Sequence, residues 1–199
     1  MVHTIHLGLV LFSVIQGTLS VYIVNGQLPS RPLGNGERLD DGRDALLAET
    51  LKHENAPYVE QLYTTSDPIE RGSVLVVYVA LLPEGILSDD LLSHMHLVEK
   101  IRSSLAEKDI LSYAIQRLRW KIEYTNVVYA LLPKEFTLSE MQNVYEAILG
   151  KQLDKRNFRK KILSLGMLKP TGKKRKQGVA RPAETYGFQK RTLEYVNVL

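Results

Sequence analysis

Residues 136–168 read FTLSEMQNVYEAILGKQLDKRNFRKKILSLGML, and this stretch decides the fold of the second half of the chain. Apolar residues recur at helical spacing over 138–149. Thr137 and Glu140 form a T-x-x-E capping box, in which each side chain accepts a hydrogen bond from the backbone of the other residue. Gly150 is suited to end the helix because it tolerates a left-handed backbone. The pattern therefore predicts a short, well-capped helix.

A second helix is predicted to begin after Asp154, whose carboxylate can cap it, and to end at Gly166. Its apolar positions form one narrow stripe, and its other face is rich in Lys and Arg. In a major groove, Arg can recognise guanine, Asn can recognise adenine, and Lys can neutralise phosphates. We expect DNA contacts from Thr137 at the start of the first helix and from Lys155, Arg156, Asn157, Arg159, Lys160 and Lys161.

A basic hairpin is predicted to follow the second helix, with a short strand at 167–169 and a return strand at 185–188. The residues expected to contact DNA between these strands are Lys173, Lys174, Arg175, Lys176 and Arg181. A basic run alone is usually a solvated loop or a targeting signal. The order of capped helix, turn, basic helix and basic hairpin instead favours a winged helix-turn-helix that binds double-stranded DNA.

Charge is divided unequally along the chain. Residues 134–199 hold 15 Lys and Arg against 6 Asp and Glu, whereas residues 1–133 hold 11 against 16, so the formal net charge of +4 hides two opposite halves. Such asymmetry is typical of a nucleic-acid-binding module joined to a domain with another role. We predict one domain at 1–124 and a DNA-binding domain at 125–199.

The composition excludes several classes of site. The 199 residues include no cysteine, which excludes disulfides and thiolate catalysis, and the five histidines form no HExxH motif, so we expect no metal site and no catalytic residues. Residues 6–24 are apolar, but they lack a basic flank and are interrupted by polar residues. A hairpin turning at Gln16 and Gly17 fits better than a membrane span. These features favour a cytoplasmic protein without membrane contact.

The first half is predicted to alternate helices and strands. After a loop at 25–36 we expect a helix at 40–52, strands at 58–64 and 73–82, helices at 91–105 and 109–124, and an extended segment at 125–132. The strand at 73–82 is the most apolar of these and is expected at the centre of a sheet. The succession indicates an α+β fold or an α/β sandwich ahead of the winged helix.

Two blocks of sequence carry a resemblance to a known family. One is YVEQLYT at 58–64, followed by Asp67-Pro68, and the other is RLRWKIEYTNVVYALLPKEFTLSEMQNVYEAILGKQLDKRNFRKKIL at 117–163. In both, the chain resembles the Nudix-related transcriptional regulators of bacteria. The resemblance implies a Nudix-like α/β/α sandwich followed by a winged helix-turn-helix. It also implies a homodimeric repressor that binds a palindromic operator, often near genes of NAD metabolism, and answers to an ADP-ribose-like nucleotide or a sugar.

A Nudix hydrolase needs the motif G-x5-E-x7-R-E-U-x-E-E-x-G-U, whose glutamates hold magnesium along one helix face. With Glu37 as the first glutamate, the R-E pair becomes Ala45-Leu46 and the E-E pair becomes Glu49-Thr50. The register that starts from Gly34 places Lys52-His53 where the metal-binding carboxylates belong. We therefore predict a protein without cofactor that is not an enzyme. A Mg-dependent hydrolase of ADP-ribose or a sugar nucleotide is the alternative.

Polar residues near this degenerate motif are the candidate ligand contacts. A phosphate of an effector could meet an arginine here, and the remaining glutamate could meet another part of the ligand. The alternative is that all of them are solvated surface residues, which is the commoner state of charged side chains. The residues are Arg31, Arg38, Arg43 and Glu49.

Overall fold

The computed structural model describes residues 4–52, 55–101, 105–176 and 182–198. The chain divides into two compact units. The first comprises Met1–Ser13, Leu19–Leu82 and Ile86–Arg117, and the second comprises Val14–Thr18, Pro83–Gly85 and Leu118–Leu199. Each unit is described by itself below. Among the described residues, no helix is both long and apolar enough to cross a membrane.

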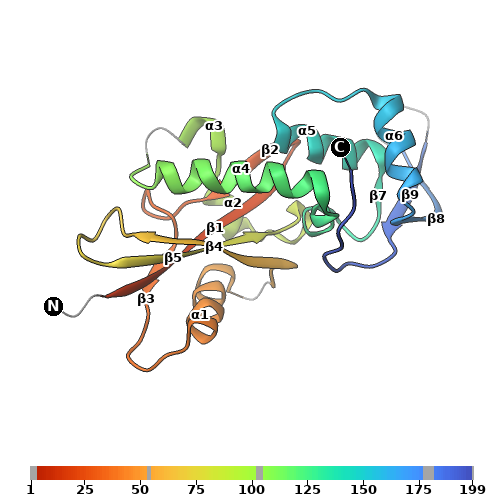
Figure 1. Ribbon diagram of the computed structural model, residues 1–199. Helices are drawn as coiled ribbons and strands as arrows, with labels where there is room; N and C mark the ends of the chain where they lie inside the picture. The colour runs from red at the N-terminus through yellow and green to blue at the C-terminus, as the bar shows by residue number, and fades with distance from the viewer. Residues whose placement is uncertain (1–3, 53–54, 102–104, 177–181, 199) are drawn as a thin grey trace. The chain divides into compact units, whose positions relative to one another are not determined.

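A twisted sheet forms the centre of the first unit (Figure 1). Its strands are β1 (Ile5–Ile15), β2 (Thr18–Tyr22), β3 (Ser30–Pro32), β4 (Tyr58–Ser66), β5 (Val74–Leu81) and β6 (Met95–Leu97). The order is β4-β5-β1-β2-β6, with β3 also paired to β1. β5 lies between β4, to which it is antiparallel, and β1, to which it is parallel. Its apolar sequence thus occupies a central position, as predicted.

Helices cover both faces of this sheet (Figure 1). α1 (Leu39–Leu51) lies on one face, where a Cβ atom on Gly42 would come within 2.6 Å of Leu7 Cδ1. The first part of α4 (Lys108–Tyr124) lies on the other face, where Tyr113 packs edge-on against Tyr63 of β4 with ring centroids 5.0 Å apart. The α/β/α sandwich predicted from the sequence is confirmed.

The hairpin predicted at the start of the chain is confirmed. β1 and β2 are adjacent and are joined at Gln16 and Gly17, whose φ angles of 49° and 77° match a tight two-residue hairpin turn. The 25–36 segment, predicted as a loop, contains the short strand β3, which pairs with β1.

The helix predicted at 91–105 is wrong. The structure has α2 (Asp89–Ser93), β6 and α3 (Val98–Ile101) there, and residues 102–104 lie outside the described residues. The backbone carbonyl of His94 accepts a hydrogen bond from the backbone N–H of Ile23 at 2.9 Å, and β6 continues this pairing with β2. Pairing with the edge of the sheet therefore overrides the local helical propensity.

The second unit contains the end of α4 and a small three-stranded sheet. The strands are β7 (Phe136–Thr137), β8 (Leu168–Arg175) and β9 (Ala183–Phe188). The other elements are the 3-10 turn η2 (Val127–Ala130) and the helices α5 (Leu138–Leu149) and α6 (Lys155–Ser164). The strand order is β7-β9-β8, both pairs antiparallel. The extended segment predicted at 125–132 is wrong, because its apolar residues form η2 and are buried.

Aromatic and aliphatic side chains form the core of this unit. Phe136, Tyr145 and Ile162 are fully buried, and the ring of Tyr145 packs edge-on against Phe158 of α6 at 5.3 Å. This core joins α5 to α6, and Phe136 packs against Phe188 of β9 at 5.2 Å. Helix, turn, helix and hairpin follow in the order that defines a winged helix-turn-helix.

The C-terminal segment 191–198 is hydrogen-bonded to residues 123–133 of the same unit. The buried side chain of Asn126 donates to the carbonyl of Thr192 at 3.0 Å and accepts from the N–H of Glu194 at 2.8 Å. The guanidinium of Arg191 donates to three carbonyl oxygens at the end of η2 and in the following loop, those of Tyr129, Leu132 and Pro133. No role was predicted for this C-terminal segment from the sequence.

Candidate DNA interface and ligand pocket

The first helix of the helix-turn-helix begins with the predicted capping box. Thr137 Oγ1 accepts from the N–H of Glu140 at 3.1 Å, and Glu140 Oε2 accepts from the N–H of Thr137 at 2.6 Å. Gly150 ends the helix with a φ of 68°. The Thr137 side chain is buried, so its hydroxyl serves the cap, and its expected contact with DNA stays a prediction.

Helix α6 presents an exposed basic face. Asp154 Oδ1 caps it by accepting from the N–H of Asn157 at 2.7 Å, while Phe158 and Ile162 anchor its inner face. The exposed side chains are those of Lys155, Arg156, Asn157, Lys160 and Lys161. The structure thus places five of the six predicted contact residues of this helix in one solvent-facing set.

Arg159 differs from its neighbours because it is only partly exposed. Its Nη2 donates to Ser139 Oγ of α5 at 3.1 Å, and its buried Nε has no hydrogen-bond partner among the described residues. Arg159 therefore links the two helices of the motif. Ser139 was not predicted as the partner of Arg159, because a serine in the first turn of a helix does not by itself indicate a contact with another helix.

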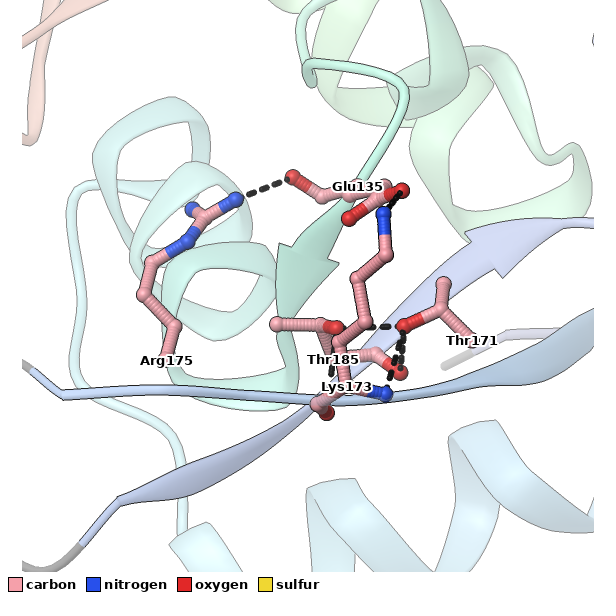
Figure 2. A network of polar contacts seen from close by, with 5 residues as sticks. All are labelled: Glu135, Thr171, Lys173, Arg175 and Thr185. Carbon is pink, nitrogen blue, oxygen red and sulfur yellow. Dashed lines mark hydrogen bonds and ion pairs between the residues drawn. The ribbon is translucent and has the colours of Figure 1, made fainter.

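Two charged side chains attach the hairpin β8–β9 to Glu135, directly before β7 (Figure 2). Lys173 Nζ donates to Glu135 Oε1 at 2.7 Å, and Arg175 Nη2 donates to the carbonyl oxygen of Glu135 at 3.0 Å. The hydroxyls of Thr171 and Thr185 are hydrogen-bonded across the strands. These contacts hold the part of the hairpin nearer its loop against the segment before β7.

The predicted cations of the hairpin therefore fall into different groups. Lys173 and Arg175 have partners within the unit, whereas Lys174 and Lys176 are exposed on the same hairpin. Arg181 lies outside the described residues. Two of the hairpin cations thus hold the hairpin in place, and the other two described ones are exposed like those of α6.

Arg31, one of the arginines predicted to bind a ligand in the first unit, has acidic partners. Arg31 Nη1 donates to Glu37 Oε1 at 2.9 Å and to the carbonyl of Gly42 at 3.2 Å, and its Nε lies 3.5 Å from Glu49 Oε1. The hydrogen bond from Arg31 and a second one from the N–H of Gly34 lower the pKa of Glu37. Three of the residues near the degenerate motif are thus joined to one another rather than held ready for a ligand.

The other two predicted ligand residues lie on or beside α1. Arg43 pairs with Asp40 at 2.8 Å and with Asp44 at 2.9 Å, and its pKa is raised mainly by the hydrogen bond to Asp44. Arg38 is exposed at the N-cap of the helix. The structure does not bring Arg38, Arg43 and Arg31 together around one pocket.

Helix α1 does not carry the donors that a Nudix magnesium site requires. Its two positions for the metal-binding E-E pair are Glu49 and Thr50, and Thr50 is buried with its hydroxyl donating to the carbonyl of Leu46 at 2.8 Å. Within the described residues, no three His, Asp or Glu side chains are grouped so as to hold a metal ion. The residues present do not fit magnesium.

A pocket of about 170 Å³ opens on the face of the sheet that α4 covers. Gly8 of β1, Val77 of β5 and Ile110 of α4 form part of its wall. Its acidic lining includes Glu107, directly before α4, and Asp67, whose carboxylate accepts from His6 Nδ1 at 2.7 Å. None of the predicted ligand residues lines it, so sequence reasoning missed this site.

Comparisons with known proteins find matches for both units. Residues 128–188 match the family model described as the NrtR DNA-binding winged helix domain. A curated protein of Acinetobacter baylyi, named ADPR responsive transcriptional repressor NtrR, is 35% identical over 146 residues, which is 67% of this chain and 57% of that protein. The chain thus spans little more than half the length of this relative.

Solved structures match over almost the whole chain. Shewanella oneidensis NrtR, crystallised with a 27mer DNA, is 28% identical with a TM-score of 0.81, and the match covers 93% of both chains. A MutT/nudix family protein from Enterococcus faecalis is 20% identical with a TM-score of 0.71, over 96% of this chain and 89% of that one. At that identity, the second match concerns the fold alone.

Proposed function

We propose that this chain is a ligand-responsive DNA-binding repressor of transcription, because residues 128–188 match the NrtR winged helix domain and the fold of the whole chain matches Shewanella oneidensis NrtR. The observation that carries the proposal is the basic face of α6, capped by Asp154, beside a basic hairpin that Glu135 and Glu140 hold in place. A rigid cationic surface of this shape suits the major groove and the flanking phosphates.

The relatives support this proposal. The Acinetobacter baylyi protein is named a transcriptional repressor responsive to ADPR, and the Shewanella oneidensis protein was crystallised with DNA. We infer that this chain likewise binds double-stranded DNA in the cytoplasm and responds to an ADP-ribose-like nucleotide or a sugar. As a homodimer it would bind a palindrome with half-sites about 34 Å apart, one helical turn, or a multiple of that distance.

We place the base contacts in the first two turns of α6. We propose that Arg156, Asn157 and Arg159 recognise bases, and that the lysines of the same helix bind phosphates. The hairpin residues Lys173, Lys174, Arg175, Lys176 and Arg181 would approach the backbone or an adjacent minor groove. Arg159 and Arg175 already have partners in the protein, so their contacts with DNA would share those side chains.

DNA binding is tested by fluorescence anisotropy with fragments from the region next to the gene for this chain. We expect one fragment to bind with high affinity, and the logarithm of the binding constant to fall linearly with the logarithm of salt concentration. Uniform weak binding to all fragments would contradict a specific operator. Binding that does not change with salt would contradict the basic surface as its cause.

We further propose that the first unit senses a ligand and does not hydrolyse it. Ala45, Leu46 and Thr50 stand where a Nudix hydrolase has charged residues, and the carboxylate of Glu49 lies beside Arg31. A single glutamate cannot hold magnesium against a diphosphate. Hydrolysis of ADP-ribose or a sugar nucleotide is the alternative function, and an activity assay with magnesium distinguishes the two.

A further inference from the structure

Glu107, which lines the pocket on the α4 side of the sheet, has a buried carboxylate oxygen without a partner among the described residues. The Glu107 side chain is 4% exposed. Its Oε1 accepts from the N–H of Leu28 at 3.1 Å, whereas its Oε2 has no hydrogen-bond partner among the described residues. Buried polar atoms are nearly always paired, and leaving one unpaired is costly. The free oxygen is therefore suited to accept a hydrogen bond from a bound molecule.

The charges around the pocket select against anions. Asp67, Glu70 and Glu107 line it, and His6 is the one basic side chain among its described lining residues. His6 is already engaged, with Nδ1 2.7 Å from Asp67 and Nε2 3.4 Å from Glu70. A phosphate placed here would face three carboxylates without a counter-charge of its own. The pocket therefore disfavours phosphate and favours a group that donates hydrogen bonds.

The size of the pocket limits the ligand to one ring. Its volume is about 170 Å³, and a cavity of about 150 Å³ holds a benzene-sized molecule. Leu28, Leu75, Val77 and Ile110 supply apolar wall for the carbon face of such a ring, while Glu107 supplies an acceptor at its edge. A hydroxylated five- or six-membered ring satisfies both requirements.

We propose that this pocket binds a pentose ring, free or as part of a nucleotide whose phosphates remain outside, and that Glu107 accepts a hydrogen bond from a ring hydroxyl. The inference deepens the ligand response proposed above and rests on it for its role in the cell. Glu107, and not the arginines near α1, would then determine ligand specificity.

Isothermal titration calorimetry of the full chain tests the assignment with D-ribose, ADP-ribose and inorganic pyrophosphate. We expect D-ribose or ADP-ribose to bind and pyrophosphate not to bind. Glu107→Gln keeps a carbonyl oxygen for the N–H of Leu28 but replaces the charged acceptor with a neutral amide. It should weaken binding of the same probe about tenfold or more. Glu99→Gln, an exposed change of equal charge on α3, should leave binding unchanged.

Each other outcome overturns the proposal. No binding of either sugar probe at millimolar concentration would do so, as would equal affinity in Glu107→Gln, or pyrophosphate binding that competes with ADP-ribose. Glu107→Leu, checked for cooperative unfolding, repeats the test without any polar group at the position. DNA binding without ligand is measured in parallel. If the wild-type chain binds no DNA, the proposed regulator is refuted, whereas a measured affinity for the pentose would still support the pocket assignment.

Discussion

Arg175 of β8 donates from one guanidinium nitrogen to both carboxylate oxygens of Glu140 on α5, at 2.9 and 3.2 Å. The same carboxylate accepts the backbone N–H of Thr137. One side chain therefore caps the first helix of the motif and also fixes the hairpin that follows the second helix. Stability and DNA binding should depend on this glutamate through two separable contacts.

Replacing Glu140 separates these contacts. Glu140→Gln preserves a residue type that can complete a capping box, so it should change stability little while weakening the attachment of Arg175. Glu140→Ala removes both contacts and should lower the free energy of unfolding by about 1–2 kcal/mol. Urea denaturation measures the difference, and DNA anisotropy should report weaker binding for both variants. Equal stability of Gln and Ala variants would show that the cap contributes nothing.

The two kinds of cation on the DNA surface should behave differently. Arg156→Ala should cost about 1–3 kcal/mol on the operator and relax selectivity at one base position, because guanidinium contacts to base edges carry sequence information. Lys160→Ala should weaken operator and unrelated DNA alike and should reduce the salt slope by about one. Competition titrations with single-base variants of the operator distinguish the two. Matching behaviour of both variants would contradict the assignment.

The sequence predicted the helix-turn-helix of the second unit well because its signals are local. The capping box of Thr137 and Glu140, the stop at Gly150 and the cap at Asp154 each need only a few neighbouring residues, and all are found as predicted. The segment at 91–105 failed because β6 forms by pairing with β2, about 75 residues earlier. Local propensity does not contain that information.

The ligand pocket could not be predicted for a related reason. Glu107 reaches the backbone of Leu28, and His6 reaches Asp67, so residues far apart in sequence assemble the site. Arg31 and Arg43 looked accessible because charged residues in polar stretches usually are, but each has an acidic partner within six residues. Motif residues that have lost their chemistry give no indication of where a ligand binds.

Acid should weaken the first unit through Asp67. Burial acts to raise the pKa of this carboxyl, but hydrogen bonds from the N–H of Glu70, from His6 and from the N–H of Ile69 outweigh it and lower the pKa. The contribution to stability is therefore complete above the unfolded pKa of about 3.9. It is lost as pH falls through the lower folded value.

The test compares wild type with Asp67→Asn by chemical denaturation across acid pH. We expect a constant difference in unfolding free energy above about pH 5, shrinking toward the folded pKa. Asp41→Asn, an exposed change on α1, controls for the general effect of removing a charge. A difference that instead grows with acidity would refute the assigned sign.

Magnesium should not confer hydrolysis. With ADP-ribose and magnesium, product formation should equal the background without protein, because α1 lacks the paired carboxylates that hold the ion. A colorimetric phosphate assay after phosphatase treatment measures the rate. Magnesium-dependent turnover that Glu49→Gln abolishes would restore the enzyme alternative.

Removing the Tyr145 hydroxyl should not harm the fold. The side chain is fully buried, its hydroxyl has no hydrogen-bond partner among the described residues, and burial raises its pKa. Tyr145→Phe keeps the ring contact with Phe158 and removes an unpaired polar atom. Thermal unfolding should show a melting temperature equal to or above that of wild type. A clear decrease would reveal a bound water at the hydroxyl.

The hydrogen bonds between residues 191–198 and residues 123–133 determine where a fragment of this protein can begin and end. A fragment trimmed to residues 128–188, which match the winged helix model, would leave the carbonyls of Tyr129, Leu132 and Pro133 without Arg191, and would lose Asn126 altogether. A DNA-binding fragment for crystallisation or NMR should therefore begin before Glu123 and continue through Val198, whose N–H donates to the carbonyl of Glu123.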